Sequence, residues 1–278
     1  MRLATIRTGV ATTAVRIDGT DAVELGVADV GALLENPDWE QRAAAADGRR
    51  HQADRLDYAP LVLRPAKIIC VGLNFRNHIL EMGRDLPEHP TLFAKYALSL
   101  IGARDEIVLP RVSAQVDWEA ELAVIVGRRV RHTSAEDALA VIAGYSVLND
   151  VSVRDYQNRT LQWLQGKTFQ STTPLGPELV TTDETTGVDG FEVTCEVDGE
   201  LAQKATTSDL VFGPAELVSY VSDIVTLEPG DVIATGTPGG VGHAHVPPRY
   251  LADGSVVVTR IEGIGECHNA CRQEPPAG

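Results

Sequence analysis

The sequence predicts a β-rich α+β protein in which mixed β-sheets are rolled around a core, with a small α+β domain at the N-terminus. Three observations support this fold class. After residue 62 the chain consists mainly of short apolar runs typical of strands, with few stretches of helical spacing. No repeat or low-complexity region interrupts these runs. With 278 residues, of which 44% are apolar, the chain is long enough for one large domain and a small appendage.

Residues 1–62 form the predicted N-terminal α+β domain. Residues 3–10 and 13–17 are expected to be short strands near the turn residues Asp18 and Gly19. Residues 27–34 and 39–46 have helical spacing. These elements are too few to form a strong core alone, so we expect the domain to dock on the main body.

Residues 63–272 form the predicted main domain, and residues 273–278 a flexible tail. The expected strands cover residues 67–71, 116–126, 144–148, 192–197, 232–234 and 255–261. Helical spacing occurs within residues 72–90, after Ser134, which forms a capping box with Asp137, and after Pro214. The apolar face of this last helix is predicted to contain Leu217, Val218, Val221 and Val225. Asp198 and Gly199 form a hairpin turn, and residues 236–242 form a glycine-rich loop.

The charge and the cysteines narrow the class of protein. The formal net charge of −15 argues against a nucleic-acid partner, because phosphate binding relies on Lys and Arg. It does not argue against a small anionic substrate. The N-terminus lacks a signal-peptide core, and no run of about eighteen apolar residues predicts a membrane span. Four thinly spread cysteines favour a cytoplasmic protein, and Cys267, His268 and Cys271 lack the second ligand pair of a structural zinc site.

The most informative residues are three carboxylates next to buried strands. Glu119 and Glu121 lie on one face of a strand whose following residues are apolar. Buried like charges repel each other, and a divalent cation such as Mg²⁺ or Mn²⁺ would offset that cost. Asp150 closes the neighbouring strand and supplies a third oxygen ligand. The alternatives are two solvated glutamates on an edge strand and an aspartate that caps a turn or helix.

His78 and Glu81 lie three positions apart, which places them on one face of a helix. A carboxylate that binds one imidazole nitrogen orients the other as a base and raises its pKa, which is the arrangement needed to activate a water. The alternative is a solvated surface pair.

The sequence does not match three common functional motifs. The sequence Gly166-Lys167-Thr168 lacks the earlier glycine of a nucleotide-binding loop, because position 161 is Leu. Residues 235–242 do not match a dinucleotide-binding fingerprint, although this loop can still offer backbone N–H groups to a carboxylate. No G-x-S-x-G sequence predicts a serine hydrolase.

Six stretches, in order and with plausible spacing, resemble the fumarylacetoacetate hydrolase superfamily, in its branch of acylpyruvate hydrolases and 2-hydroxyhepta-2,4-diene-1,7-dioate isomerases. They are residues 71–81, 93–95, 117–121, 149–157, 166–169 and 235–242. The resemblance covers roughly residues 65 to 270. It implies a β-rich roll, a homodimer, and a site for Mg²⁺, with Mn²⁺ or Ca²⁺ as alternatives.

The resemblance also implies a role for individual residues. The implied metal ligands are Glu119, Glu121 and Asp150. His78 and Glu81 match a water-activating dyad on a lid over the substrate. The implied polar and cationic groups around the substrate are Lys95, Arg154, Gln157, Lys167, Gly236 and Thr237. Leu73 stands where the family often has Arg, and Tyr96-Ala97 where it often has Pro-Ser, so the substrate is left open.

The expected activity is metal-dependent hydrolysis of a C–C bond in an acylpyruvate. In this mechanism His78, oriented by Glu81, activates a water, and Gln157 with Lys167 stabilises the oxyanion. The alternative is decarboxylation or isomerisation of a related substrate, such as oxaloacetate or 2-hydroxyhepta-2,4-diene-1,7-dioate, on the same metal site. A catalytically silent relative is a third class. The acyl pocket is expected to involve the lid, residues 96–100 and residues 159–165, where Trp163 either lines the pocket or packs in the core.

Overall fold

The computed structural model describes residues 1–185 and 190–276. The strands are β1 (Arg2–Thr8), β2 (Ala11–Asp18), β3 (Asp21–Glu24), β4 (Arg50–Gln52), β5 (Ile68–Gly72), β6 (Thr91–Lys95), β7 (Leu100–Ile101), β8 (Ile107–Leu109), β9 (Val116–Asp117), β10 (Ala120–Val126), β11 (Ile142–Asn149), β12 (Ser152–Val153), β13 (Thr173–Thr181), β14 (Glu192–Val197), β15 (Glu200–Thr206), β16 (Val232–Ala234), β17 (Val256–Ile261) and β18 (Gly265–Gln273). The helices are α1 (Val30–Leu34), α2 (Trp39–Ala45), α3 (Arg76–Glu81), α4 (Ala135–Ala138), α5 (Arg154–Gln157), α6 (Leu164–Lys167) and α7 (Pro214–Ile224).

Two sheets account for most of the strands. The larger sheet has the order β4-β3-β2-β1-β13-β11-β10-β16-β5-β6, and β7 also pairs with β13. The second sheet has the order β15-β14-β17-β18-β8, and β12 and β9 form a separate pair. Most neighbouring strands are antiparallel, but β16 and β5 run parallel. This is the expected mixed, strand-rich fold.

The main core lies between the two sheets and explains the apolar strands. Leu122 and Val124 of β10 belong to the same buried cluster as Val193 of β14 and Val257 of β17. The alternate residues of β10, such as Ala123, pack into a second cluster on the opposite face. Because β10 is buried on both faces, its sequence is almost continuously apolar. The carboxylates next to this strand therefore lie at the edge of a dry core.

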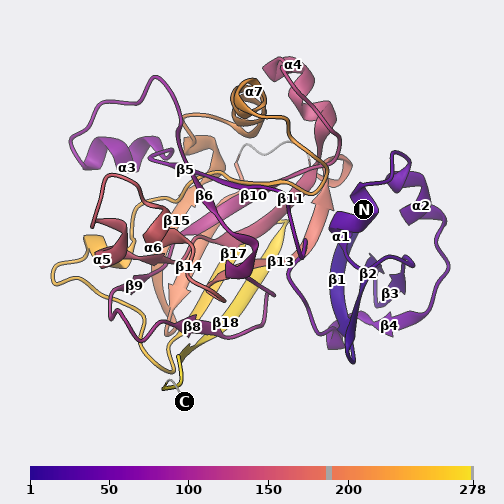
Figure 1. Cartoon of the computed structure of the whole chain (residues 1–278), viewed down its shortest axis with the longest axis horizontal. Coiled ribbons are helices and arrows are strands. Elements are labelled where there is room, and N and C mark those ends of the chain that lie inside the picture. The colour runs from indigo at the N-terminus through magenta and orange to yellow at the C-terminus, as the bar shows by residue number, and fades with distance from the viewer. Residues whose placement is uncertain (186–189, 277–278) are drawn as a thin grey trace.

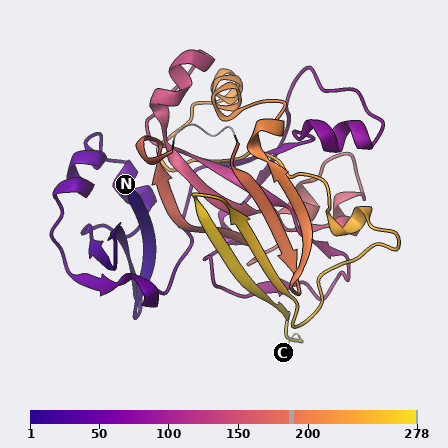
Figure 2. The ribbon, with the colours of Figure 1, turned by 180° about the vertical axis from the view of Figure 1, so that it is seen from behind.

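The N-terminal strands extend the larger sheet. β1 pairs antiparallel with β13, with Arg2 opposite Val180. Figures 1 and 2 show residues 1 to about 60 as a lobe on the side of the molecule opposite α3. Within this lobe α1 begins at Val30, because the side chain of Asp29 accepts a hydrogen bond from the N–H of Ala32 and caps the helix.

The elements differ from the sequence prediction at several places, and β13, β6, β7 and β8 are among the strands that were not predicted. The strand predicted at residues 116–126 is broken between β9 and β10 at Trp118 and Glu119. The helix after Ser134 is a single turn, although Ser134 does cap it. Val225 ends the helix α7 and is 36% exposed, so it is not part of the apolar face. β18, which pairs with β17, was not predicted.

Two other predictions concern the ends of the chain and the membrane. Residues 277–278 of the predicted tail lie outside the described residues. Within the described ranges, no helix has the length and apolar character needed to cross a bilayer.

Candidate metal centre

Three carboxylates meet at the break between β9 and β10. Glu119 lies in the break, Glu121 is the second residue of β10, and Asp150 follows β11. Their ligand oxygens all lie within 4.8 Å of one another, and all three residues are buried. The antiparallel register brings them together, since Ala120 is opposite Asn149. The N–H of Asp150 donates to the carbonyl of Glu119 at 2.8 Å, which fixes the two backbones at the site.

Two buried lysines neutralise part of this cluster. The ammonium of Lys167 donates to Glu119 Oε2 at 2.6 Å and to Asp150 Oδ2 at 2.9 Å. The ammonium of Lys95 donates to Asp150 Oδ1 at 2.6 Å. Burial alone would raise the pKa of Asp150, but the charges of Lys167 and Lys95 outweigh it and lower that pKa to about 2.

No lysine or arginine among the described residues forms an ion pair with Glu121. It is 1% exposed, and its Oε2 accepts one hydrogen bond, from the N–H of Gly236 at 2.7 Å. Burial, followed by the negative charges of Asp150 and Glu119, raises the pKa of Glu121 well above its ordinary value. A buried carboxylate next to two others needs a positive neighbour, and hard divalent cations prefer such oxygen ligands. The residues present therefore fit a divalent cation.

The charge balance agrees with this assignment. Around the centre, the four buried carboxylates of Asp117, Glu119, Glu121 and Asp150 face the three buried cations Lys95, Arg154 and Lys167. The unbound centre thus carries about one excess negative charge, and a divalent cation would leave about one excess positive charge, which favours an anionic ligand.

Arg154 opens α5 and connects the centre to the cavity. Its guanidinium donates through Nε to Asp117 at 2.7 Å and through Nη1 to Gln157 at 2.9 Å. Nη1 also lies 2.7 Å from Glu119 Oε1. Its Nη2 is buried and has no hydrogen-bond partner among the described residues. An unfilled donor at a buried position is available to a ligand that supplies an acceptor.

The glycine-rich loop after β16 forms one wall of the site. Gly236 has φ +100°, and a Cβ there would lie 2.9 Å from the carbonyl oxygen of Val71, so only glycine brings this N–H to Glu121 without strain. Thr237 donates to the carbonyl of Ala120 at 3.0 Å. Gln203 of β15 donates to Thr237 Oγ1 at 2.8 Å. It also accepts from the N–H of Ala120 at 2.9 Å, so it holds the loop against β10.

A cavity of about 270 Å³ opens above the carboxylates. Its lining includes the sequence-predicted residues His78, Glu119, Glu121, Arg154, Gln157, Lys167 and Thr237, together with Leu73, Met82, Arg84, Phe93, Trp163, Val241 and His243. Trp163 both lines the cavity and packs edge-on against Phe93. Gly72 allows this packing, because a Cβ at that position would lie 2.4 Å from the indole of Trp163.

Of the two predicted dyad residues, His78 lines the metal cavity and Glu81 does not. Both lie on α3, and both approach Gly239, where an added Cβ would lie 3.2 Å from His78 Nδ1 and 3.4 Å from Glu81 Oε2. His78 lines the metal cavity, whereas Glu81 lines a neighbouring hollow that His78 shares. Burial lowers the pKa of His78 and outweighs the charge of Glu81. The raised pKa expected for this histidine is therefore wrong.

The family model described as fumarylacetoacetate (FAA) hydrolase C-terminal matches residues 67–272. The chain belongs to the fumarylacetoacetate hydrolase family. Among its relatives is the human mitochondrial oxaloacetate tautomerase FAHD2A, which is 44% identical over 227 residues, covering 81% of this chain and 72% of the relative. The corresponding mitochondrial oxaloacetate tautomerase of Rattus norvegicus is 42% identical over 226 residues, with coverage of 81% and 72%.

Solved structures of this family share the whole fold. The fumarylacetoacetate hydrolase of the psychrophile Exiguobacterium antarcticum superposes with a TM-score of 0.86 at 32% identity, covering 99% of this chain and 100% of the other. The 5-carboxymethyl-2-hydroxymuconate delta-isomerase of Mycobacterium smegmatis superposes with a TM-score of 0.82 at 33% identity and the same coverage. The names of the similar proteins favour isomerase and tautomerase chemistry more than the expected C–C bond hydrolysis.

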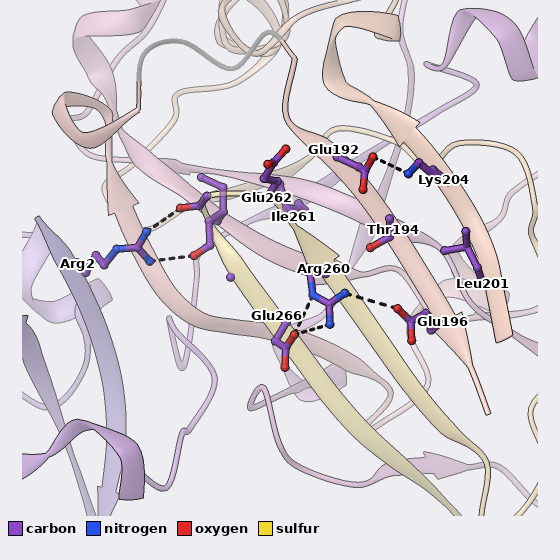
Figure 3. Close-up of a pocket in the computed structure, with 13 residues that line it drawn as sticks. Arg2, Glu192, Thr194, Glu196, Leu201, Lys204, Arg260, Ile261, Glu262 and Glu266 are labelled. Carbon is purple, nitrogen blue, oxygen red and sulfur yellow. Dashed lines mark hydrogen bonds and ion pairs between the residues drawn. The ribbon is translucent and has the colours of Figure 1, made fainter. Parts of the chain in front are cut away.

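A larger hollow lies elsewhere on this protein, and its charged side chains are paired with one another. Figure 3 shows it on the outer face of the second sheet, where β14, β15, β17 and β18 contribute most of the lining and Arg2 lies at its rim. It measures about 650 Å³, but its cations are paired within it. Arg260 contacts Glu266 at 2.8 Å, and Lys204 contacts Glu192 at 2.8 Å. The smaller cavity, with an unpaired buried carboxylate and an unfilled guanidinium donor, is therefore the functional candidate.

The sequence did not identify two residues that shape the metal centre and its cavity. Asp117 is fully buried, holds Arg154, and accepts from the N–H groups of Gly242 at 2.7 Å and His243 at 2.9 Å. Gln203 connects the glycine loop to β10. Asp117 could have been found, because it begins the same stretch as Glu119. Gln203 lies in a hairpin 83 positions away from Ala120 in the sequence. No motif near Gln203 points to its role in the site.

Proposed function

We propose that this protein is a divalent-cation-dependent enzyme that interconverts the keto and enol forms of a small 2-oxo acid, with oxaloacetate as the first substrate to test. The observation that carries this proposal is the buried carboxylate of Glu121, which has no cationic partner and lies beside Glu119 and Asp150 below the cavity. Two relatives are named as oxaloacetate tautomerases, and this supports tautomerisation over hydrolysis.

Glu119, Glu121 and Asp150 would hold the cation, for which Mg²⁺ is the first candidate and Mn²⁺ or Ca²⁺ are alternatives. When bound, the cation would supply a chelation point for a 2-oxo carboxylate and a Lewis acid for its keto oxygen. Ion pairs with Lys95 and Lys167 hold Asp150 in place and lower its pKa, and Lys167 also holds Glu119. Arg154 Nη2 offers a hydrogen bond to an anionic oxygen of the substrate.

His78 is the proposed proton carrier. Because its pKa is lowered, its imidazole is neutral near pH 7 and can act as a base. In the enol-to-keto direction the ring takes the proton from the enol oxygen and delivers a proton to the adjacent carbon. The net reaction is the transfer of one proton from oxygen to carbon, without an attacking water. Gly236 and Gln157 remain hydrogen-bonding groups that orient the site.

Acylpyruvate hydrolysis is the second candidate. The observation that favours it is that His78 and Glu81, on one face of α3, both approach Gly239. With the carboxylate of Glu81 orienting the imidazole of His78, the dyad could activate a water. In that reaction Gln157 and Lys167 would stabilise the oxyanion formed at the distal carbonyl.

A panel assay separates these functions. Purified protein is given Mg²⁺ or Mn²⁺, with a chelator control, and offered enol-oxaloacetate, acetylpyruvate and fumarylpyruvate. Metal-dependent decay of the enol absorbance without pyruvate formation supports the tautomerase. Pyruvate from oxaloacetate indicates a decarboxylase, and pyruvate from acetylpyruvate indicates the hydrolase. The absence of activity on all of these substrates contradicts the proposal.

Two further properties remain proposals, the first from the family resemblance and the second from the thinly spread cysteines. We expect a homodimer, which light scattering coupled to size-exclusion chromatography would measure. We also keep the cytoplasmic location as a prediction, although the similar tautomerases are named as mitochondrial proteins. Fractionation of the source cells would test it.

A further inference from the structure

Arg84 is positioned over the metal cavity by the end of α3. The N–H of Gly83 donates to the carbonyl of Leu80 at 2.9 Å, and the N–H of Arg84 donates to the carbonyl of Ile79 at 3.2 Å. Together with the left-handed backbone of Gly83, at φ +67°, these two bonds form a Schellman motif. The motif turns the chain back on itself directly after the helix. Arg84 then lines the same cavity as Glu119, Lys167 and Arg154.

The guanidinium of Arg84 has no partner. It is exposed, and neither an ion pair nor a side-chain hydrogen bond to it occurs among residues 1–185 and 190–276. Other exposed arginines without an ion pair in the described part of the chain, such as Arg76, do not line this cavity. Burial is the main cause of the lowered pKa of His78, and the positive charges of Arg154 and then Arg84 add to it.

The charge balance of the centre indicates what Arg84 would bind. With a divalent cation, the buried centre carries about one excess positive charge, which one carboxylate of a chelating 2-oxo acid neutralises. A second carboxylate would find no compensating charge on the cavity floor. Arg84 supplies that charge on the same cavity's wall, and its planar fork of donors suits a carboxylate.

We propose that Arg84 binds the far carboxylate of a 2-oxo dicarboxylate and so makes the cavity selective for dicarboxylic over monocarboxylic 2-oxo acids. This inference rests on the proposed function of the metal centre, but it concerns a residue that neither the family resemblance nor the metal site assigns. Arg84 is a specificity residue here, since it binds the far carboxylate and takes no part in moving the proton between the keto oxygen and the neighbouring carbon.

The test uses two ligands that differ only at the far end. Oxaloacetate and 2-oxobutyrate have the same four-carbon chain, with a carboxylate in the first where the second has a methyl group. Calorimetric binding of each ligand is measured with the Mg²⁺-loaded wild type and with Arg84→Leu, Arg84→Lys and Arg76→Leu. Arg76 lies at the start of α3, is exposed and does not line the cavity, so its variant makes the same charge change elsewhere on the helix.

The expected result is a weaker affinity of Arg84→Leu for oxaloacetate by about ten- to thirtyfold, the effect of a partly exposed charge-assisted hydrogen bond. Its affinity for 2-oxobutyrate should change by less than about twofold. Arg84→Lys should recover part of the preference, and Arg76→Leu should behave as the wild type. Because Arg84 is exposed, its variants should keep the melting temperature of the wild type, and this control excludes misfolding.

Two outcomes would overturn the inference: a wild type that does not prefer oxaloacetate, or an Arg84→Leu variant that keeps the preference. The proposed function fails separately. If the wild type binds dicarboxylates selectively through Arg84 but shows no metal-dependent tautomerisation, the subsite stands and the tautomerase does not. If tautomerisation occurs and the preference survives in Arg84→Leu, the tautomerase stands and the subsite does not.

Discussion

The carboxylate of Asp117 accepts a 2.7 Å hydrogen bond from Nε of Arg154, and this pair joins the metal centre to the end of the glycine-rich loop. The same carboxylate accepts from the N–H groups of Gly242 and His243. Arg154 in turn contacts Glu119. Asp117 therefore fixes a substrate-facing guanidinium and one wall of the cavity together, although it does not line the cavity.

Replacing Asp117 with Asn should harm both stability and activity. The amide keeps the shape but removes one of the two negative partners of the buried Arg154, and its NH₂ group faces donors. We expect a loss of about 3 kcal/mol in the free energy of unfolding, measured in urea. The control is Asp57→Asn at the surface pair with Arg7, where the Asp57 side chain is 66% exposed. Its loss should stay below about 0.5 kcal/mol, and equal losses in the two variants would contradict this account.

Replacing Glu121 with Gln should abolish stabilisation by Mg²⁺. In the wild type, a cation concentration of about 100 times Kd should add about 2.7 kcal/mol to the free energy of unfolding. Glu121→Gln removes one ligand charge, so the affinity should fall by more than about 100-fold. At the same time it removes a buried like charge, so the metal-free variant should be at least as stable as the metal-free wild type. Melting curves with Mg²⁺ and with chelator measure both effects, and an unchanged response to Mg²⁺ would refute the ligand assignment.

The stability of the metal-free protein should depend on pH in opposite senses at two carboxyls. The pKa of Glu121 is raised, so its contribution is fully present at low pH and is lost as pH rises from about 4.5 through its folded pKa. The pKa of Asp150 is lowered to about 2, so its contribution is present above about 4 and is lost as pH falls toward 2. Urea unfolding between pH 5 and pH 8 should show stability falling with pH in the wild type and a weaker slope in Glu121→Gln. A steeper slope in the variant would show that another group is responsible.

Replacing His78 with Asn should lower kcat by about 10²- to 10⁴-fold, because the proton carrier is lost while the metal ligands remain. In the wild type, kcat/KM should fall as pH drops below the histidine pKa, which burial places lower than 6.5. This acidic limb should be absent from the residual activity of the variant. Mg²⁺ binding, followed by melting temperature, serves as the control and should not change. An acidic limb that persists in His78→Asn would assign the proton transfer to another group.

Replacing Gly236 with Ala should displace the loop that donates to Glu121. The new methyl group would lie 2.9 Å from the carbonyl oxygen of Val71 at a residue with φ +100°. We expect destabilisation by about 3 kcal/mol and weaker Mg²⁺ binding. Gly254→Ala is the matched control, since Gly254 also has positive φ, +84°, but nothing lies within 4 Å of an added Cβ. That variant should lose only about 1 kcal/mol and keep its Mg²⁺ response.

The carboxylate cluster could be predicted from sequence because its chemistry is local. Glu119 and Glu121 interrupt an otherwise apolar strand, and Asp150 ends the next one, so strand pairing alone brings them together. The family resemblance then supplied Lys95, Arg154 and Lys167, which the structure brings to the same centre.

Other features have no local signal. Leu73 lines the cavity with φ +55°, a conformation that leucine rarely adopts and that only the surrounding fold can impose. Glu81 lines a hollow beside the metal cavity instead of the cavity itself, and Gly239, which lies next to both side chains of α3, is far along the chain. β18 alternates buried and exposed residues, but its buried set includes Asn269, whose amide is satisfied by carbonyls from residues 102 and 105 far along the chain. Such long-range partners hide the period-two pattern from sequence analysis.

The pairing of β1 with β13 gives residues 1–62 a protective role for the sheet as a whole. β13 has nine residues and is mostly buried, and without β1 its outer edge would present unpaired N–H and C=O groups to other chains. With the N-terminal strands in place, the sheet ends instead at β4, a three-residue strand of Arg, His and Gln. A short polar strand is a poor template for edge-to-edge aggregation. The N-terminal lobe, which lies away from the metal centre, therefore replaces an aggregation-prone sheet edge with one that resists pairing to other chains.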